Sequence, residues 1–198
     1  MSKSAGREGE ALLVVGIGGT VRPGSSTDAA LQAALGAARA RGAATRCFAG
    51  PLLAELARFH PADPARSPGA VELVEAVRHA DGVIVASPGY HASISGMVKN
   101  ALDYLEDLRE DPRPYLSARA VGCIATGAGW QATVSTLAAM RAIVHSLRGW
   151  PTPLGATINT AGTPSDEDAR RVGFQLDTIG AEVVEFALSR RAAAVATG

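Results

Sequence analysis

The sequence predicts an α/β protein in which helices cover both faces of a parallel β-sheet. Five short apolar runs alternate with segments of helical periodicity along the 198 residues. An alternation of strand, loop and helix requires right-handed crossovers, which give a parallel sheet with helices on both sides. The chain is 47% hydrophobic and 19% charged, which is the balance of a globular protein rather than a disordered one.

The five predicted strands are short continuous apolar runs, the pattern of strands that are buried on both faces. They span residues 11–17, 44–48, 83–87, 120–125 and 154–159. The predicted helices carry apolar residues three or four positions apart, such as Leu31 and Leu35 or Val71 and Val74. These helices span residues 27–41, 69–79, 97–108, 131–147 and 166–191, with one or two further turns within 52–58.

Glycine and proline mark the ends of these elements, as Gly42 does after the first helix. The length fits one domain of ordinary size. We therefore predict a single domain over residues 11–190, a disordered tail at 1–10 and a frayed tail at 191–198. In a five-stranded sheet of order 2-1-3-4-5, strands one, three and four are neighbours. Because ligands bind at the carboxyl ends of such strands, the three polar loops that follow them are expected to form one site.

The first of these loops has the composition of a phosphate-binding loop. Gly19 and Gly24 have the spacing of an NTP-binding loop, but Ser25 and Ser26 stand where its Lys-Ser/Thr pair belongs, which argues against an NTPase. The glycine pattern of dinucleotide-binding proteins also fails, at Val21. Hydroxyl groups, a guanidinium and a helix N-terminus together suit a terminal phosphate. The candidate ligands are Thr20, Arg22, Ser25, Ser26 and Thr27. The alternative is a plain helix N-cap with additional serines.

The second loop carries a motif that is specific to one family. Residues 87–96 read S-P-G-Y-H-A-S-I-S-G, and M-V-K-N-A-L-D follows them. Together with G-T-V-R-P-G-S-S-T at 19–27, this segment resembles the NADPH-dependent FMN reductase family of flavodoxin-like proteins, over about residues 11–160. The resemblance implies a flavodoxin-like three-layer fold, bound FMN, hydride transfer from NADPH or NADH, and a homodimer or homotetramer.

Site residues follow from this resemblance position by position. In the first loop, Thr20, Arg22, Ser25 and Thr27 would hold the FMN phosphate, with threonine at positions 20 and 27 where the family more often has serine and asparagine. In the second loop, the residues that would line the isoalloxazine ring are Pro88, Gly89, Tyr90, His91 and Ser93. Gly89 replaces the Glu or Met often found in the family, so we expect more room above the flavin. His91 is a weak candidate for a catalytic acid and otherwise a contact to the ring edge.

The third loop, Thr126-Gly127-Ala-Gly129-Trp130, stands where the family has a glycine-rich turn beside the flavin. Trp130 replaces a position that is commonly glycine. It would restrict nicotinamide access or stack on an aromatic substrate, and the alternative is simple packing against the neighbouring loop. Lys99 and Asp103 form either an i,i+4 helix pair or, as the resemblance suggests, part of a subunit interface.

Other function classes are excluded by composition and motif. The 19 basic and 19 acidic residues balance, which argues against nucleic-acid binding and against a polybasic membrane patch. No apolar run approaches the ~20 residues that span a bilayer, and the polar start lacks a signal-peptide core, so we expect a cytoplasmic protein. Cys47 and Cys123 lie in predicted strands and are expected to be buried and inert. No cluster has metal-ligand spacing.

The sequence thus predicts an FMN-dependent NAD(P)H oxidoreductase that passes electrons to flavin, a quinone or another small organic acceptor. One alternative is a flavodoxin-type electron carrier. Carriers of that kind dock their partners through an acidic face, and the zero net charge disfavours this alternative. The other is a tailoring enzyme with one dedicated aromatic substrate, for which Gly89 and Trp130 are the indications.

Overall fold

A computed structural model describes residues 11–196, so the predicted tail at 1–10 lies outside the described residues. A parallel sheet forms the middle layer, and its strands are β1 (Leu13–Gly18), β2 (Ala44–Ala49), β3 (Gly82–Tyr90), β5 (Ala120–Gly127), β6 (Trp150–Pro151) and β7 (Ala156–Asn159). The seventh strand, β4 (Ser93–Ile94), pairs antiparallel with the end of β3. The order along the sheet is β2-β1-β3-β5-β6, with β7 also beside β5. The predicted order is confirmed.

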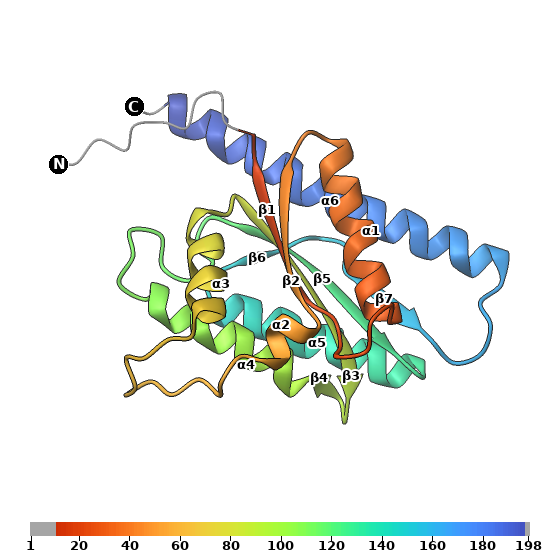
Figure 1. Cartoon of the computed structure of the whole chain (residues 1–198). Helices are drawn as coiled ribbons and strands as arrows, with labels where there is room; N and C mark the ends of the chain where they lie inside the picture. Colours follow the sequence, from red (N-terminus) through yellow and green to blue (C-terminus); the bar gives the residue numbers. More distant parts are fainter. Residues whose placement is uncertain (1–10, 197–198) are drawn as a thin grey trace.

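Helices form the two outer layers (Figure 1). They are α1 (Ser26–Ala40), α2 (Pro51–Ala54), α3 (Pro68–His79), α4 (Gly96–Asp103), α5 (Trp130–Ser146) and α6 (Asp166–Ala196), with a 3-10 turn at Tyr104–Leu108. Helices α1 and α6 pack on one face of the sheet, and α3, α4 and α5 cover the other. Helix α6 continues past Arg191 to Ala196, because the alanine-rich segment that follows Arg191 consists of good helix formers.

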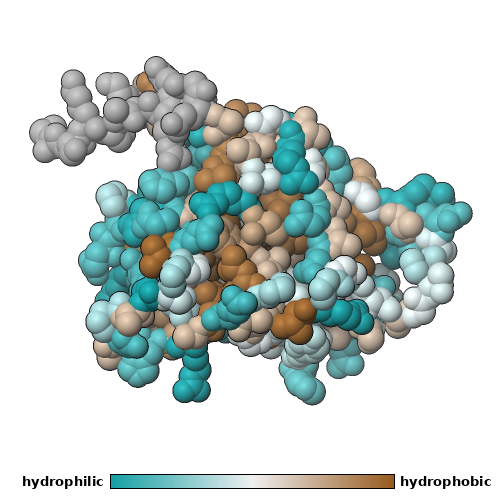
Figure 2. All heavy atoms as spheres, viewed as in Figure 1, coloured by the Kyte–Doolittle hydropathy of each residue, from teal (hydrophilic) through white to brown (hydrophobic). Residues whose placement is uncertain are grey.

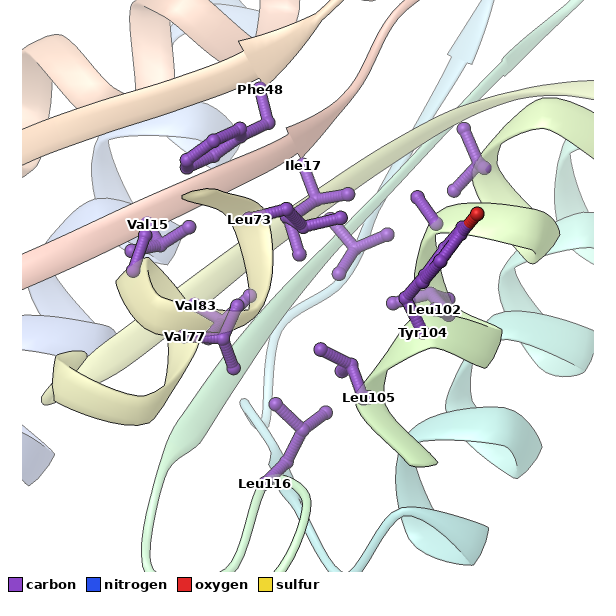
Figure 3. Packing of buried hydrophobic residues seen from close by; sticks show 14 of the residues in the cluster. Val15, Ile17, Phe48, Leu73, Val77, Val83, Leu102, Tyr104, Leu105 and Leu116 are labelled. Carbon is purple, nitrogen blue, oxygen red and sulfur yellow. The ribbon is translucent and has the colours of Figure 1, made fainter. Parts of the chain in front are cut away.

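Two hydrophobic cores lie on opposite faces of the sheet, because successive strand residues point to opposite sides. On the α3/α4 face, Val15 and Ile17 of β1 pack with Leu73 and Leu102 (Figure 3). On the α1/α6 face, neighbouring strand residues such as Val14 contact the second core. On this face, glycines in the strands allow α6 to pack close to the sheet. A Cβ at Gly82 would lie 2.4 Å from Val183 of α6, and a Cβ at Gly122 would lie 2.4 Å from Ile179.

The fifth parallel strand is divided into β6 and β7, where the sequence predicted one strand over 154–159. Pro153 lies at the break and has no N–H group to donate to the sheet. The guanidinium of Arg141, on α5, donates to the carbonyls of Thr152 and Pro153, both at 2.9 Å. The side chain of Arg141 therefore replaces strand hydrogen bonds where the strand is broken.

Strand β2 is the edge strand of the sheet, and its outer side chains are exposed. The prediction of a buried thiol was wrong for Cys47, which is exposed on this strand, whereas Cys123 in the central strand β5 is buried. Burial raises the pKa of the Cys123 thiol to about 12, so the thiol stays protonated at neutral pH.

Figure 2 shows hydrophilic residues over much of the viewed face, with hydrophobic residues visible between them.

At the amino edge of the sheet, Arg119 is fully buried. Its side chain joins the end of α3 to the turn that precedes β5. Its guanidinium donates to the carbonyl of Arg78 at 2.8 Å and to that of Ala80 at 3.0 Å, both at the C-terminal end of α3. It also donates to the carbonyls of Tyr115 and Ser117, at 3.0 and 3.3 Å. Burial lowers the pKa of Arg119 to about 9, so the group remains charged at pH 7.

Candidate functional site

The three polar loops meet at the carboxyl edge of the sheet, on the opposite side from Arg119. The N–H of Gly19, just after β1, donates to the carbonyl of Ala86 in β3 at 3.2 Å. The hydroxyls of Thr27 and Thr126 are buried and 2.6 Å apart, which joins the first loop to the third. These contacts put the predicted site residues on one surface, with β1, β3 and β5 as its rigid base.

The first loop uses part of its polar side chains to support its own conformation. Ser25 is buried and caps α1, since its hydroxyl accepts from the N–H of Asp28 at 3.2 Å. The hydroxyl of Thr20 donates to the carbonyl of Arg22 and accepts from the N–H of Arg22, both at 3.2 Å. The Asp28 carboxylate accepts from the N–H of Thr20 at 3.3 Å. Asp28 was not among the predicted functional residues of this loop, although Ser-x-x-Asp at a helix start has the pattern of a capping box.

The groups that face outward at this loop suit a phosphate. Arg22 and Ser26 are exposed, and the N-terminal N–H groups of the 15-residue helix α1 lie behind them. A helix N-terminus carries a partial positive charge and free N–H donors, so it binds anions. Of the five predicted ligands, Arg22, Ser26 and the partly exposed Thr20 are accessible. The buried Ser25 and Thr27 position the loop and the helix.

The second loop is a β-hairpin rather than an irregular segment. Strand β3 continues to Tyr90, β4 begins at Ser93, and Tyr90 pairs with Ser93. The two residues between them have positive φ, +50° at His91 and +65° at Ala92, as in the two-residue turns that favour Asn-Gly. Tyr90 is 55% exposed. The hairpin therefore projects an aromatic ring and an imidazole from the edge of the sheet.

Replacing His91-Ala92 with Asn-Gly is expected to stabilise the protein by about 1–2 kcal/mol, because L-residues other than Asn and Gly are strained at positive φ. Urea unfolding of the double variant measures this change. Ala57→Gly is the control, since φ at Ala57 is not positive and glycine there should only destabilise. A double variant no more stable than the parent would show that the turn is not strained.

Gly89 does not open space above the hairpin, in contrast to the prediction. A Cβ at Gly89 would lie 2.6 Å from the hydroxyl oxygen of Thr136 and 3.1 Å from the carbonyl oxygen of Ala132, both on α5. Thr136 also donates to the carbonyl of Ser93 at 3.2 Å. Glycine at position 89 therefore reflects the close packing of α5 on the hairpin. This removes Gly89 as an indication of a larger substrate.

The third loop turns sharply at Gly129, whose φ is +127°, and α5 begins at Trp130. Its backbone is fixed by the amide oxygen of Asn159, which accepts from Gly129 at 2.9 Å and from Ala161 at 3.0 Å. The Trp130 ring is 48% exposed, and the guanidinium of Arg171 lies 5.3 Å from the ring centroid. Arg171 and Asn159 were not predicted, because they lie far from the loop in sequence.

Residues 12–163 match the family model described as NADPH-dependent FMN reductase. The chain belongs to this family. The matched region contains all three loops and every predicted site residue.

Among curated relatives of this FMN reductase family member is the FMN-dependent NADPH-azoreductase of Staphylococcus aureus. It is 33% identical over 97 residues, which are 49% of this chain and 48% of the relative. The chain thus aligns with about half the length of the curated relatives it matches. Of solved structures, an oxidoreductase from Corynebacterium diphtheriae has a TM-score of 0.69 and 21% identity, covering 90% of this chain and 97% of the other.

An apo NADH:FMN oxidoreductase structure has a TM-score of 0.66 and 23% identity, covering 87% of this chain and 90% of that chain. At these identities the two structures establish the flavodoxin-like fold of this family member, and the three-layer arrangement agrees with it.

Three other residues of the family motif, Lys99, Asn100 and Asp103, lie on α4 and form hydrogen bonds or an ion pair there. The amide of Asn100 donates to the carbonyl of Ala57 at 2.9 Å and accepts from the N–H of Phe59 at 2.8 Å. Lys99 and Asp103 form an i,i+4 ion pair of 2.5 Å.

Within residues 11–196, no group of three or more His, Cys, Asp or Glu is arranged to hold a metal. No helix in that range is both long and apolar enough to cross a bilayer.

Proposed function

We propose that the protein is an FMN-dependent oxidoreductase that takes electrons from NADPH or NADH and reduces a small organic molecule. Family membership supports the reaction class. The observation that carries the proposal is the first loop, where the exposed Arg22 and Ser26 stand before the N-terminus of α1. That donor set fits the terminal phosphate of FMN and is placed where the carboxyl ends of β1, β3 and β5 meet.

The hairpin and the third loop have the properties that a flat ring system requires beside that phosphate. Backbone groups of Pro88 and Gly89 lie on the rigid end of β3, and Tyr90 presents an aromatic surface. FMN, when bound, supplies the redox chemistry, and the protein supplies binding, orientation and the exclusion of water. Hydride transfer of this kind needs no side-chain acid, so His91 is assigned a contact role rather than a catalytic one.

The proposal is tested with the purified protein and added FMN. We expect a yellow complex with the flavin absorption shifted from that of free FMN. We also expect NADPH or NADH oxidation that depends on an acceptor such as a quinone, an azo compound or free flavin. A protein that takes up no FMN would contradict the assignment of the site. A protein that binds FMN and oxidises neither nicotinamide with any acceptor would be an electron carrier instead.

Replacing Arg22 with alanine is expected to weaken FMN binding about tenfold or more, since a hydrogen bond to a charged group contributes about 1.5–3 kcal/mol. Fluorescence titration of FMN measures the dissociation constant. Arg58→Ala is a matched control, because Arg58 is exposed and lies outside the three loops. Riboflavin, which lacks the phosphate, should bind both variants equally. An unchanged FMN affinity in Arg22→Ala would place the phosphate elsewhere.

We further propose that residues 11–190 act as one domain within a homodimer or homotetramer in the cytoplasm. The two cores share one continuous sheet, which supports the single domain. Light scattering after gel filtration tests the assembly, and a monomer at micromolar concentration would contradict it. The choice between NADPH and NADH is measured by comparing kcat/KM for the two.

A further inference from the structure

A cavity lies beside the three-loop site, on the side of α1 and α6. Its volume is about 560 Å³, which is within the range of pockets that hold small organic ligands. Its walls come from the N-terminal parts of α1, α5 and α6, from β7 and from the loop at 160–164. It touches the three-loop site at only two residues, Ser26 and Trp130. The cavity is therefore a neighbouring compartment at the same edge of the sheet.

The apolar lining of this cavity has an aromatic part and an aliphatic part. Trp130 lines it with a half-exposed ring. Ala30, Val172 and Leu176, from α1 and α6, form an apolar wall. An indole exposed to this extent gains most from a flat partner, because aromatic rings favour stacked or edge-to-face contacts. The cavity thus favours a planar ring over a flexible or globular ligand.

The charges that line the cavity cancel. Arg171 forms an ion pair with Asp168, at 2.7 Å. The hydroxyl of Ser165 also donates to Asp168, at 2.7 Å, so the pair is fixed at the start of α6. A charged ligand would gain little net attraction from a lining with one positive and one negative group. An uncharged ring is the better match.

Two polar side chains of the lining, Asn159 and Arg171, offer hydrogen-bond donors to a ligand. The amide oxygen of Asn159 is occupied by the backbone N–H groups of Gly129 and Ala161, so its NH₂ group is the end that can serve a ligand. The guanidinium of Arg171 has five N–H donors and no acceptor, and the bond to Asp168 uses one of its nitrogens. A ligand with carbonyl oxygens or ring nitrogens would satisfy these donors.

We infer that this cavity binds an uncharged planar aromatic ring bearing acceptor atoms, stacked on Trp130 and hydrogen-bonded to Arg171 or Asn159. Two kinds of molecule carry this chemistry: an aromatic carbonyl compound that the enzyme reduces, and the adenosine half of the nicotinamide cofactor. Binding itself needs neither FMN nor turnover, whereas the identity of the ligand as acceptor or cofactor rests on the proposed function.

The two tryptophans of the chain allow a direct binding test. Trp150→Phe leaves Trp130 as the single tryptophan and is conservative, since Trp150 packs on Phe186 at the surface. Without nicotinamide, titration with flavone, a planar aromatic carbonyl compound, and separately with adenosine should quench Trp130 fluorescence saturably in at least one case. Trp130→Phe, which retains Trp150, should show only the linear loss caused by absorption of light. Equal curves in the two variants, or no saturation with either probe, would overturn the inference.

Filling the cavity with a larger side chain gives the second test. Ala169 is exposed on the first turn of α6 and lines the cavity, so Ala169→Phe should weaken binding of the probe about tenfold or more. Ala192→Phe, on the exposed far end of the same helix, is the matched control and should bind normally. FMN affinity should be unchanged in both variants. Competition between FMN and the probe would also contradict a separate compartment. Because these titrations contain no nicotinamide, a failure of the redox proposal would leave them interpretable.

Discussion

Replacing Arg119 with methionine is expected to lower the free energy of unfolding by about 3 kcal/mol. Methionine fills similar volume but donates no hydrogen bond, so the partly buried carbonyls of Arg78, Tyr115 and Ser117 lose their Arg119 donor. A fully buried group left without a partner costs about 1–3 kcal/mol, so three partly buried groups together account for a loss of about 3 kcal/mol. The turn that Arg119 holds also contains two residues at positive φ, Tyr115 at +52° and Ala118 at +60°. Without the guanidinium, little would offset the strain in this turn.

Urea unfolding at pH 7 measures this loss, and two variants make it specific. Arg119→Lys keeps the charge, but an ammonium lacks the planar fork that reaches carbonyls on both segments, so an intermediate loss is expected. Arg58→Met removes an exposed arginine and should leave stability unchanged. FMN affinity of the folded Arg119→Met protein should equal that of the parent, because Arg119 lies at the opposite edge of the sheet. A stability change under 1 kcal/mol would show that water replaces the lost donors.

The role of Arg119 illustrates what the sequence could not reveal. Arginine next to a predicted strand is most often a surface residue, and nothing local indicates that it is buried against α3. The apolar runs, by contrast, predicted β1, β3 and β5 well, because central strands of a parallel sheet are buried on both faces. The same reasoning was wrong for Cys47, since an apolar run does not distinguish a central strand from an edge strand.

In the candidate site, the sequence predicted the three loops. It did not predict which of their side chains face a ligand and which support the loop. The hydroxyl groups of the first loop look equivalent in the sequence, yet the structure buries Ser25 and Thr27 and exposes Ser26. That division depends on Thr126, which is 99 residues from Thr27. Likewise, glycine is present at position 89 because α5 packs closely against it, which the sequence around Gly89 does not indicate. Contacts across such sequence separations carry no local signal, so a single sequence does not show them.

A methyl group at Gly18 is expected to damage both the fold and the site. A Cβ there would lie 2.0 Å from the carbonyl oxygen of Ala86 and within 3 Å of its nitrogen and carbonyl carbon, in the paired strand β3. These are backbone atoms of the central sheet, which have no rotamer to change, so β1 and β3 must separate. The bond from Gly19 to Ala86 at 3.2 Å would be lost with them. Overpacking of this kind costs about 3 kcal/mol or more.

Gly18→Ala should therefore weaken FMN binding at least tenfold even where the protein remains folded, because the end of β1 sets the position of the first loop. Gly24→Ala separates crowding from backbone strain. Gly24 also has positive φ, +66°, but a Cβ there meets no atom within 4 Å, so only the conformational cost of about 1 kcal/mol applies. Unfolding in urea and FMN titration of both variants give the comparison. If the two variants lose equal stability, strain at positive φ rather than contact with Ala86 determines the effect, and the first loop is not positioned by β3.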